Sequence, residues 1–432
     1  MMRKIWPAVV AVLLTACNSA SSGQDGSVAV TRLEVAPTTL SAGEPATYTW
    51  EVDAVPDAVC TLDVGSDGTP DYTPPCGAGE QAHTFAAPGT FAATFTVATA
   101  ADRRSRQAPA VTVAGAGESS AFSKLTFRPT ASPPYGVAEG QGVSLGGKLY
   151  VFGGFDSESP YRCCRPTDRT YVFDPDAATW TPLAPLPPMN GTSFGGVNHA
   201  GFTTDGQDVY FAGGYTSNPR NSAHSFGTRE AWRYNVAANT YTRLPDMPGV
   251  RGAGALEYLG GKLYYFGGSN DRRKLDTGDL YILDLEGDTD RWTAGAPLPN
   301  PRNHLGSAVL GGKIYAVGGQ HKHDGALTTQ NDVHAYNPAT DTWERVAGLP
   351  LAISHNSNST FVMGERMIVV GGEVGHLEGV ADVFAYSPES DRWAELTPLP
   401  KAMVDPIADV VDGRIIVSYD WEPETYIGTP VE

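Results

Sequence analysis

The chain has 432 residues, with 48 acidic and 30 basic side chains and a formal net charge of -18 at pH 7. A chain this acidic, with no basic run, repels polyanions, so nucleic acid is excluded as a partner. The length is sufficient for two domains, and the larger of them can bury a substantial core.

Residues 1–16 carry the pattern of an export signal. Arg3 and Lys4 precede an apolar run at residues 5–14 that is too short to span a bilayer, and Leu-Thr-Ala then leads into Cys17. This pattern resembles a bacterial lipoprotein signal with its lipobox. The resemblance implies cleavage before Cys17, acylation of that cysteine and stable attachment to a membrane. The alternative is an ordinary secretory peptide.

The residues after the signal predict where the protein is held. Asn18, which follows Cys17, resembles the residue that sorts lipoproteins to the outer membrane. Residues 17–27 are expected to form a polar, glycine-containing tether. We therefore expect an extracytoplasmic protein anchored by lipid to the cell envelope, at the outer membrane or the cell surface.

Residues 28–114 predict a small β-sandwich. Short apolar stretches such as residues 47–52 and 90–97 alternate with Pro- and Gly-containing turns. The segment at residues 88–97 (PGTFAATFTV) resembles the last strand of PKD and immunoglobulin-like modules. Cys60 and Cys76 are expected to form a disulfide, because an exported domain this small has a limited core. We interpret the module as a spacer, joined to the next domain by a linker at residues 115–120.

The rest of the chain, residues 121–432, repeats a unit of about fifty residues. Each unit has a turn, an apolar strand ending in two glycines, and a later closing aromatic residue. The first glycines of the pairs are Gly153, Gly213, Gly267, Gly318 and Gly371. The closing aromatic residues are Trp180, Tyr241, Trp292, Trp343 and Trp393. This package resembles the kelch repeat, whose four-stranded blades stack around an axis as a β-propeller.

The repeat count predicts an all-β, six-bladed propeller behind the sandwich. A sixth strand pair is recognisable at residues 411–417, but no closing tryptophan follows it. We expect residues 122–127 to supply the outer strand of this last blade, because closing the ring removes the free edge. The alternative is a glycine-rich antiparallel sandwich in which the glycine pairs mark unrelated turns.

The variable loops after the glycine pairs predict the functional face, since binding sites are commonly built from loops on a rigid scaffold. Aligning the repeats on their turns places one residue of each blade at the axial mouth, with further basic residues just upstream. The aligned residues are Glu139, His199, Ala253, His304, Ser357 and Asp405, and the upstream residues are Arg251, Arg302 and His355. We expect all of these except Ala253 to contact a ligand.

The chemistry of this ring leaves several possibilities open. Imidazoles and carboxylates can hold a divalent metal, move protons on a sugar, or hydrogen-bond a glycan or peptide. A metal set of His199, His304, Glu139 and Asp405 is the weakest of these predictions, and no cofactor is predicted. The alternative is a hydrated channel whose polar groups bind water and backbone.

Cys163 and Cys164 interrupt the loop of the first full blade. In an exported protein, adjacent cysteines are more often a disulfide than a metal site. Once Cys17 is acylated the four remaining thiols allow three pairings, of which we favour Cys60 with Cys76 and Cys163 with Cys164.

The resemblance alone leaves the function open, because kelch propellers include copper radical oxidases, sialate mutarotases and protein-binding adaptors. The oxidase type requires a Tyr-His dipeptide, and this chain has none, which disfavours that activity. The sequence predicts a recognition protein whose propeller binds a carbohydrate or protein ligand. The alternative is a sugar-directed enzyme similar to the periplasmic sialate mutarotases, with the acids and imidazoles of the mouth moving protons.

Overall fold

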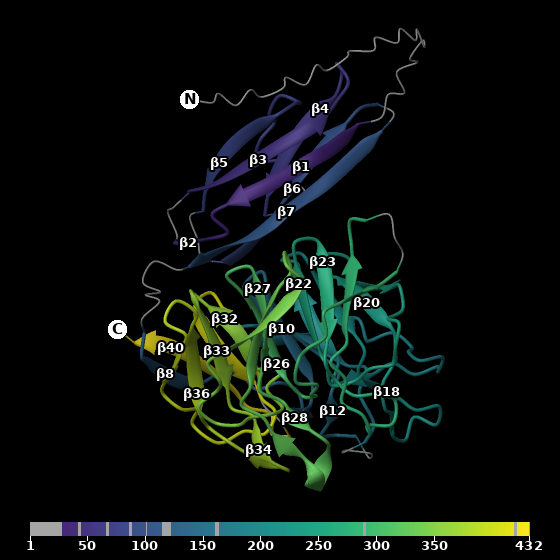
Figure 1. The fold of residues 1–432 in the computed structure, drawn as a ribbon, viewed down its shortest axis with the longest axis vertical. Helices are drawn as coiled ribbons and strands as arrows, with labels where there is room; N and C mark the ends of the chain where they lie inside the picture. Colours follow the sequence, from purple (N-terminus) through teal and green to yellow (C-terminus); the bar gives the residue numbers. More distant parts are fainter. Residues whose placement is uncertain are drawn as a thin grey trace, which may run out of the picture.

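A computed structural model describes residues 28–41, 45–65, 69–85, 89–100, 102–114, 122–159, 164–287, 291–418 and 421–431. These residues form two bodies built of β-strands, a long sandwich and a broader propeller (Figure 1). The signal at 1–16, the tether at 17–27 with Cys17, and the linker at 115–120 lie outside the described residues. Among the described residues, no helix has the length and apolar character needed to cross a membrane.

The sandwich consists of two sheets that enclose one core. The first sheet has the order β1-β3-β5 and the second has the order β2-β7-β6-β4. The strands are β1 (Ala29–Ala36), β2 (Thr39–Ser41), β3 (Pro45–Asp53), β4 (Val59–Val64), β5 (Gly79–Thr84), β6 (Gly89–Ala98) and β7 (Arg103–Ala114).

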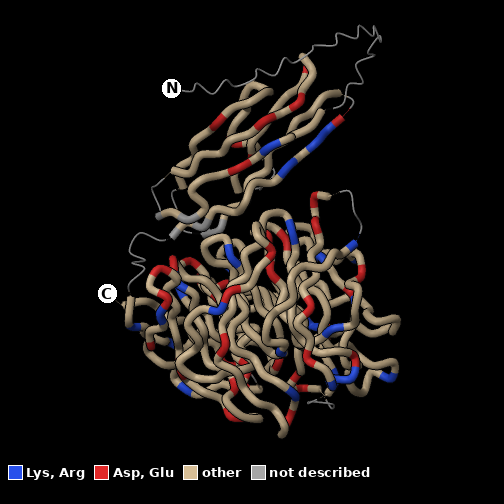
Figure 2. The backbone as a smooth tube through the Cα atoms, viewed as in Figure 1, with Lys and Arg blue, Asp and Glu red and all other residues tan. Residues whose placement is uncertain are grey.

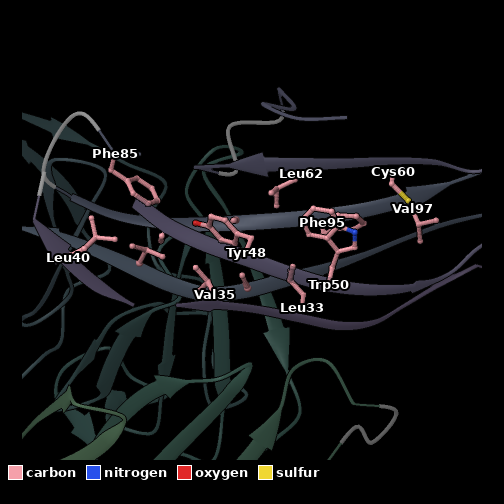
Figure 3. Packing of buried hydrophobic residues seen from close by; sticks show 14 of the residues in the cluster. Leu33, Val35, Leu40, Tyr48, Trp50, Cys60, Leu62, Phe85, Phe95 and Val97 are labelled. Carbon is pink, nitrogen blue, oxygen red and sulfur yellow. The ribbon is translucent and has the colours of Figure 1, made fainter. Parts of the chain in front are cut away.

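Alternation along the strands produces the core of the sandwich, since successive side chains point to opposite faces of a sheet. Tyr48 and Trp50 of β3 are buried while their neighbours are partly exposed, and the Trp50 ring lies 4.9 Å from that of Phe95 on β6 (Figure 3). A disulfide joins Cys60 to Cys76 with the Cα atoms 5.4 Å apart, as the sequence predicted. It ties the loop before β5 to the second sheet.

In the described part of the chain, six four-stranded antiparallel sheets form the blades of the propeller. The first blade contains β10 (Gln141–Leu145), β11 (Lys148–Phe152), β13 (Thr170–Asp174) and β14 (Thr179–Pro182). The second contains β16 (Gly201–Thr204), β17 (Asp208–Ala212), β20 (Ala231–Asn235) and β21 (Thr240–Leu244). The third contains β22 (Ala255–Leu259), β23 (Lys262–Phe266), β24 (Leu280–Asp284) and β25 (Thr293–Gly295).

The fourth blade contains β26 (Gly306–Leu310), β27 (Lys313–Val317), β30 (Val333–Asn337) and β31 (Thr342–Val346). The fifth contains β32 (Thr360–Met363), β33 (Arg366–Val370), β36 (Val383–Ser387) and β37 (Arg392–Glu395). The sixth contains β38 (Ile407–Val411), β39 (Arg414–Ser418), β40 (Thr425–Val431) and β8 (Lys124–Pro129). Each inner strand contacts the inner strands on both sides, and β38 contacts β10, so the ring is closed. The fold is the six-bladed propeller that the repeats predict.

The sixth blade is built from both ends of the domain. The strand that completes it is β8, which pairs antiparallel with β40 from Lys124 opposite Val431 to Pro129 opposite Tyr426. It therefore begins two residues later than the segment 122–127 chosen from the sequence. Residue Phe122 lies before this strand and packs under the guanidinium of Arg366 in the fifth blade, 4.3 Å from the ring centroid.

The glycine pairs are the points where neighbouring blades touch through their backbones. Both glycines of each pair have positive φ, which glycine adopts without strain. The N–H of the second glycine donates to a carbonyl at the start of the next blade, at 2.8 to 3.1 Å. The five bonds run from Gly154 to Val197, Gly214 to Arg251, Gly268 to Arg302, Gly319 to Ile353 and Gly372 to Met403.

The closing aromatic residues join the blades at the outer edge. Each donates a hydrogen bond to a backbone carbonyl of the preceding blade, which lies 46 to 57 residues earlier in the chain. The bonds are Trp180 to Ala131, Tyr241 to Ala184, Trp292 to Pro245, Trp343 to Ala296 and Trp393 to Ala347. Because Ala131 follows β8, the bond from Trp180 also ties the first blade to the composite sixth blade.

Short strands in the loops that precede the inner strands and follow the glycine pairs form one face of the propeller, the lower face in Figure 1. Their elements are β9 (Val137–Ala138), β12 (Phe155–Asp156), β15 (Val197–Asn198), β18 (Tyr215–Ser217), β19 (His224–Ser225), β28 (Gln320–His321), the 3-10 turn η1 (Asp324–Ala326), β29 (Thr328–Thr329), β34 (Glu373–Gly375) and β35 (Glu378–Gly379).

The sandwich lies at the opposite face, against the turns between the first and second strands (Figure 1). Strand β7 carries a run of basic residues on this side (Figure 2), and Gln107 donates to Gln207 at 2.7 Å. Arg106 and Glu286 are 3.8 Å apart, an exposed pair that contributes little. A cavity of about 630 Å³ remains between the domains. Because the sandwich lies at this face, it leaves the face that carries the loops uncovered.

A matched pair of glycine substitutions tests the contact between blades. Gly153→Ala would place a Cβ 2.1 Å from the Val197 carbonyl, whereas Gly146→Ala, at a similar positive φ, meets nothing within 4 Å. We expect Gly153→Ala to destabilise the propeller by about 3 kcal/mol or more and Gly146→Ala by about 1 kcal/mol. Chemical denaturation measures both, and equal losses would contradict the proposed role of the glycine pair.

Candidate functional site

The axial mouth is built on a ring of residues in the left-handed backbone conformation. Glu139, His199, Ala253, His304 and His355 have φ between 49° and 56°. In the third, fourth and fifth blades, the ring residue donates its N–H to the carbonyl of the ring residue before it, at 2.8, 2.8 and 3.0 Å. This conformation is uncommon for residues other than glycine, so the ring is held in place by the packing of the blades.

Three imidazoles meet at this ring. The ring centroids of His199 and His304 are 4.6 Å apart, those of His304 and His355 are 4.2 Å apart, and those of His199 and His355 are 6.2 Å apart. One nitrogen of each histidine lies within 4.8 Å of one nitrogen of each of the others. Side chains from blades two, four and five therefore converge on one point.

A polar side chain holds one nitrogen of each imidazole. The Nε2 atom of His199 is 3.2 Å from the carboxylate of Glu139, and the Nδ1 atom of His355 is 2.5 Å from that of Glu373. The Nδ1 atom of His304 hydrogen-bonds the side-chain oxygen of its neighbour Asn303. These partners fix the orientation of each ring.

The electrostatics of the three groups differ. Burial, followed by the neighbouring imidazoles, holds the pKa of His304 well below its usual value. Burial opposes a charge on His355, but the hydrogen bond to Glu373 and the charges of the surrounding carboxylates together outweigh it and raise the pKa of His355. Burial would likewise raise the pKa of Glu139, but the adjacent His199 holds that pKa below its usual value.

Further aromatic and basic groups line the mouth. The His323 ring lies edge-on to His304 with the centroids 5.5 Å apart, and burial lowers the pKa of His323 to about 3. Arg273 lies 4.9 Å from the ring centroid of Phe226 and 5.8 Å from that of Tyr215. The guanidinium also pairs with Asp324 at 2.9 Å. The mouth thus combines hydrogen-bonding groups with flat apolar surfaces.

One position predicted for the mouth is wrong. His355, rather than Ser357, occupies the ring position of the fifth blade, since its N–H donates to His304. In blades one to four the inner strand begins two residues after the ring, but in blade five β32 begins only at Thr360. The sequence alignment counted back a fixed number of residues from the turn between the first two strands, and in blade five this count reaches Ser357. Ser357 lines the axial channel instead.

Asp405 of the sixth blade is buried beside the fifth blade. Its Oδ1 atom accepts a hydrogen bond from the side chain of Asn358 at 3.2 Å. It is absent from the set of groups close enough to share a metal ion within the described chain, and so is Glu139. The predicted metal set of His199, His304, Glu139 and Asp405 is therefore replaced by the three histidines of the ring.

The two upstream arginines brace the backbone instead of facing a ligand. Arg302 is fully buried and donates to the carbonyls of Gly318, Asn300 and Ala316 at 2.5 to 3.0 Å. Arg251 donates to the hydroxyl of Tyr281 at 2.7 Å and also pairs with Asp279. All of these partners belong to strands and turns of the scaffold, which corrects the predicted ligand role of both arginines.

Sequence reasoning missed Glu373, and a recognisable signal marks its position. The residue directly after each glycine pair forms a backbone bridge with the residue just before the ring position. The pairs are Phe155 with Ala138, Tyr215 with Asn198, Ser269 with Gly252, Gln320 with Asn303 and Glu373 with Ser354. The residue after each Gly-Gly therefore lies beside the mouth in every continuous blade.

The predicted pairing of Cys163 with Cys164 falls partly on Cys163, which lies outside the described residues. Cys164 itself is described, in the turn before Pro166.

Below the mouth, the inner strands enclose an axial channel of about 230 Å³. Glu257 and Asp409 face this channel from β22 and β38. Burial, and then the proximity of Asp409, raise the pKa of Glu257 to about 7, although Ser307 and Thr203 hydrogen-bond its carboxyl group. The channel therefore contains an acid that holds its proton up to neutral pH.

Comparison with known proteins places these features in a class. Residues 245–417 match a family model described as the KLHDC2/KLHL20/DRC7 Kelch-repeats domain, and residues 142–187 match the Kelch motif. The solved structure titled "Structure of YjhT" aligns with a TM-score of 0.54 at 14% identity, over 69% of this chain and 95% of that chain. The chain carries kelch repeats and is built as a kelch-type propeller.

Curated relatives share parts of this domain. Kelch-like protein terF of Aspergillus terreus is 28% identical over 253 residues, 58% of this chain and 52% of that protein. The N-acetylneuraminate epimerase of Shigella sonnei is 38% identical over 95 residues, 21% of this chain and 25% of that protein. The chain thus spans about half of the first relative and a quarter of the second.

The buried acid of the channel predicts a pH effect on stability. Because the pKa of Glu257 is higher in the folded state than the ordinary value of 4.5, its ionisation destabilises the fold as the pH rises from about 4.5 to about 7. We expect Glu257→Gln to match the wild type at pH 4 and to exceed its unfolding free energy by about 1 to 3 kcal/mol at pH 8. Denaturation series across pH measure the difference, and parallel curves for the two proteins would contradict it.

Proposed function

We propose that the protein is a recognition protein held outside the cytoplasm by lipid on Cys17, and that the axial mouth binds a carbohydrate ligand. The observation that carries this proposal is the convergence of His199, His304, His355 and Glu139 at one end of the propeller axis. The sandwich lies at the opposite face, where it serves as a spacer and leaves the mouth open to a ligand.

The composition of the mouth supports a carbohydrate. Sugar hydroxyl groups need fixed donors and acceptors, and a site whose buried polar groups pair with hydroxyls rejects analogues that lack them. The carboxylate of Glu139 and the imidazole of His199 supply both kinds of group. Phe226, which is only partly buried, adds a flat apolar face against which the C–H face of a sugar ring can pack. A partial similarity to the N-acetylneuraminate epimerase agrees with a sugar ligand.

A protein ligand at the same face is the other outcome within this proposal. The hairpin loops that surround the mouth vary in length from blade to blade, which suits an irregular partner surface.

A sugar-directed enzyme is the second candidate function, and one observation favours it. The pairs Glu139–His199 and Glu373–His355 each join a carboxylate to an imidazole at hydrogen-bonding distance. Such pairs are suited to general acid and base catalysis, including the proton transfers of sugar anomerisation.

Substitution of the ring histidines tests the site. We expect glycan arrays and titration calorimetry with the full chain to detect a sugar ligand, and His199→Ala with His304→Ala to reduce its affinity by about 10-fold or more, since buried polar partners are lost. His83→Ala in the sandwich is the matched control and should leave binding unchanged. If the double variant binds the sugar with the affinity of the wild type, the ligand site lies elsewhere in the protein.

The same samples separate binding from turnover. Sugar anomerisation followed by NMR should proceed at the uncatalysed rate if the mouth only binds. A catalysed rate that is lost in the double variant would favour the enzyme.

Anchoring is tested at the lipid attachment site. When the full chain is expressed in a Gram-negative host, we expect Cys17→Ser to move it from the membrane fraction to the soluble fraction and to abolish incorporation of labelled fatty acid. Ser19→Ala is the control, and a Cys17→Ser protein that remains membrane-bound would contradict lipid anchoring.

A further inference from the structure

The imidazoles of the mouth are arranged so that each keeps one nitrogen available. In His304 and His355 the Nδ1 atom is held by an oxygen, that of Asn303 and that of Glu373 respectively. An Nδ1–H that donates to oxygen leaves the lone pair on Nε2. In His199 the pairing is reversed, because Nε2 faces Glu139 and the buried Nδ1 has no hydrogen-bond partner among the described residues.

This arrangement is unusual for histidines that only fill a core. Buried polar atoms are nearly always hydrogen-bonded, and an unpartnered one costs about 1 to 3 kcal/mol. Each of the three rings offers one nitrogen within 4.8 Å of a nitrogen of the other two. A cation at their centre would satisfy all three at once.

We propose that His199, His304 and His355 bind a single divalent transition-metal ion at the axial mouth. Neutral imidazole is a preferred ligand of zinc and its neighbours, at metal–nitrogen distances of about 2.0 to 2.1 Å. Three protein ligands leave a fourth position for water or for an oxygen of a bound ligand. Metal binding at this site is independent of the proposed sugar binding, because the three histidines are in place without a sugar.

Three neighbouring groups orient the ligands and support the same assignment. A metal-bound imidazole commonly donates its other N–H to a carboxylate or carbonyl oxygen, and this fixes its tautomer. Glu373, which is 1% exposed, and Asn303, which is fully buried, take this position for His355 and His304, and Glu139 does so for His199. The three are positioning residues rather than ligands.

A fourth imidazole borders the site. The ring of His323 lies 5.5 Å from that of His304, and within the described part of the chain its two buried nitrogens have no hydrogen-bond partner. It belongs to the loop after the glycine pair of the fourth blade.

Zinc binding to the full chain tests the proposal. After dialysis against a chelator, titration calorimetry with Zn²⁺ should give one site per chain. His199→Ala and His304→Ala should each weaken Zn²⁺ binding by more than about 100-fold, since loss of a ligand exceeds the 10- to 100-fold effect of losing an orienting partner. His83→Ala, whose Nδ1 atom contacts the hydroxyl of Tyr72 in the sandwich at 3.1 Å, should bind zinc like the wild type.

Two further measurements keep the test decisive if an alanine variant unfolds. Glu373→Gln retains the size of the side chain and should weaken Zn²⁺ binding by about 10- to 100-fold while the melting temperature of the metal-free protein stays within a few degrees. Co²⁺ in place of zinc should give the visible absorption of a four-coordinate nitrogen site, and His304→Asn should abolish it. A wild-type chain that binds no zinc, or variants that bind it as tightly as the wild type, would overturn the proposal. Because no sugar is present, a failure here leaves carbohydrate binding to be judged by its own experiment.

Discussion

The hydrogen bond from the second glycine of each pair to the next blade is the interaction on which the propeller depends. A blade is hydrophobic on both faces and cannot bury either face alone, so it is stable only against two neighbours. The first glycine of the pair approaches the next blade so closely that a Cβ would not fit, since it would lie 2.1 Å from the Val197 carbonyl oxygen at Gly153 and 2.4 Å from that of Ile353 at Gly318. The aromatic residues at the rim repeat the connection further out, and strand β8 completes the circle.

The same contact positions the functional face. The carbonyl that accepts from the glycine lies two residues before the left-handed ring residue in blades two to four, as Val197 lies before His199. Each ring residue is therefore fixed relative to the blade before it as well as to its own. Residues some fifty positions apart become neighbours around an axis, and imidazoles from three blades share one small volume. The loops that follow the glycines then enclose this volume without supporting the fold.

Much of the fold was predictable because it is encoded locally and repeated. The glycine pairs, the turn residues and the closing rings recur with one spacing, and each recurrence strengthens the prediction of four strands per blade. The need for a last strand followed from the missing tryptophan in the final repeat, although β8 begins two residues later than expected. The presence of His199 and His304 at the mouth followed from the same register.

The sequence by itself determined the repeat, the number of blades, the face that carries the loops and the three histidines as candidates for the mouth, since all of these depend on periodicity and on turn chemistry. Only the tertiary structure decided which residue completes the cluster. The extra residues before β32 shift the register, so that His355 replaces Ser357, and Arg302 turns inward to bind carbonyls 14 and 16 residues later in its own blade. Contacts of this kind depend on distances in space, which a local sequence pattern does not contain.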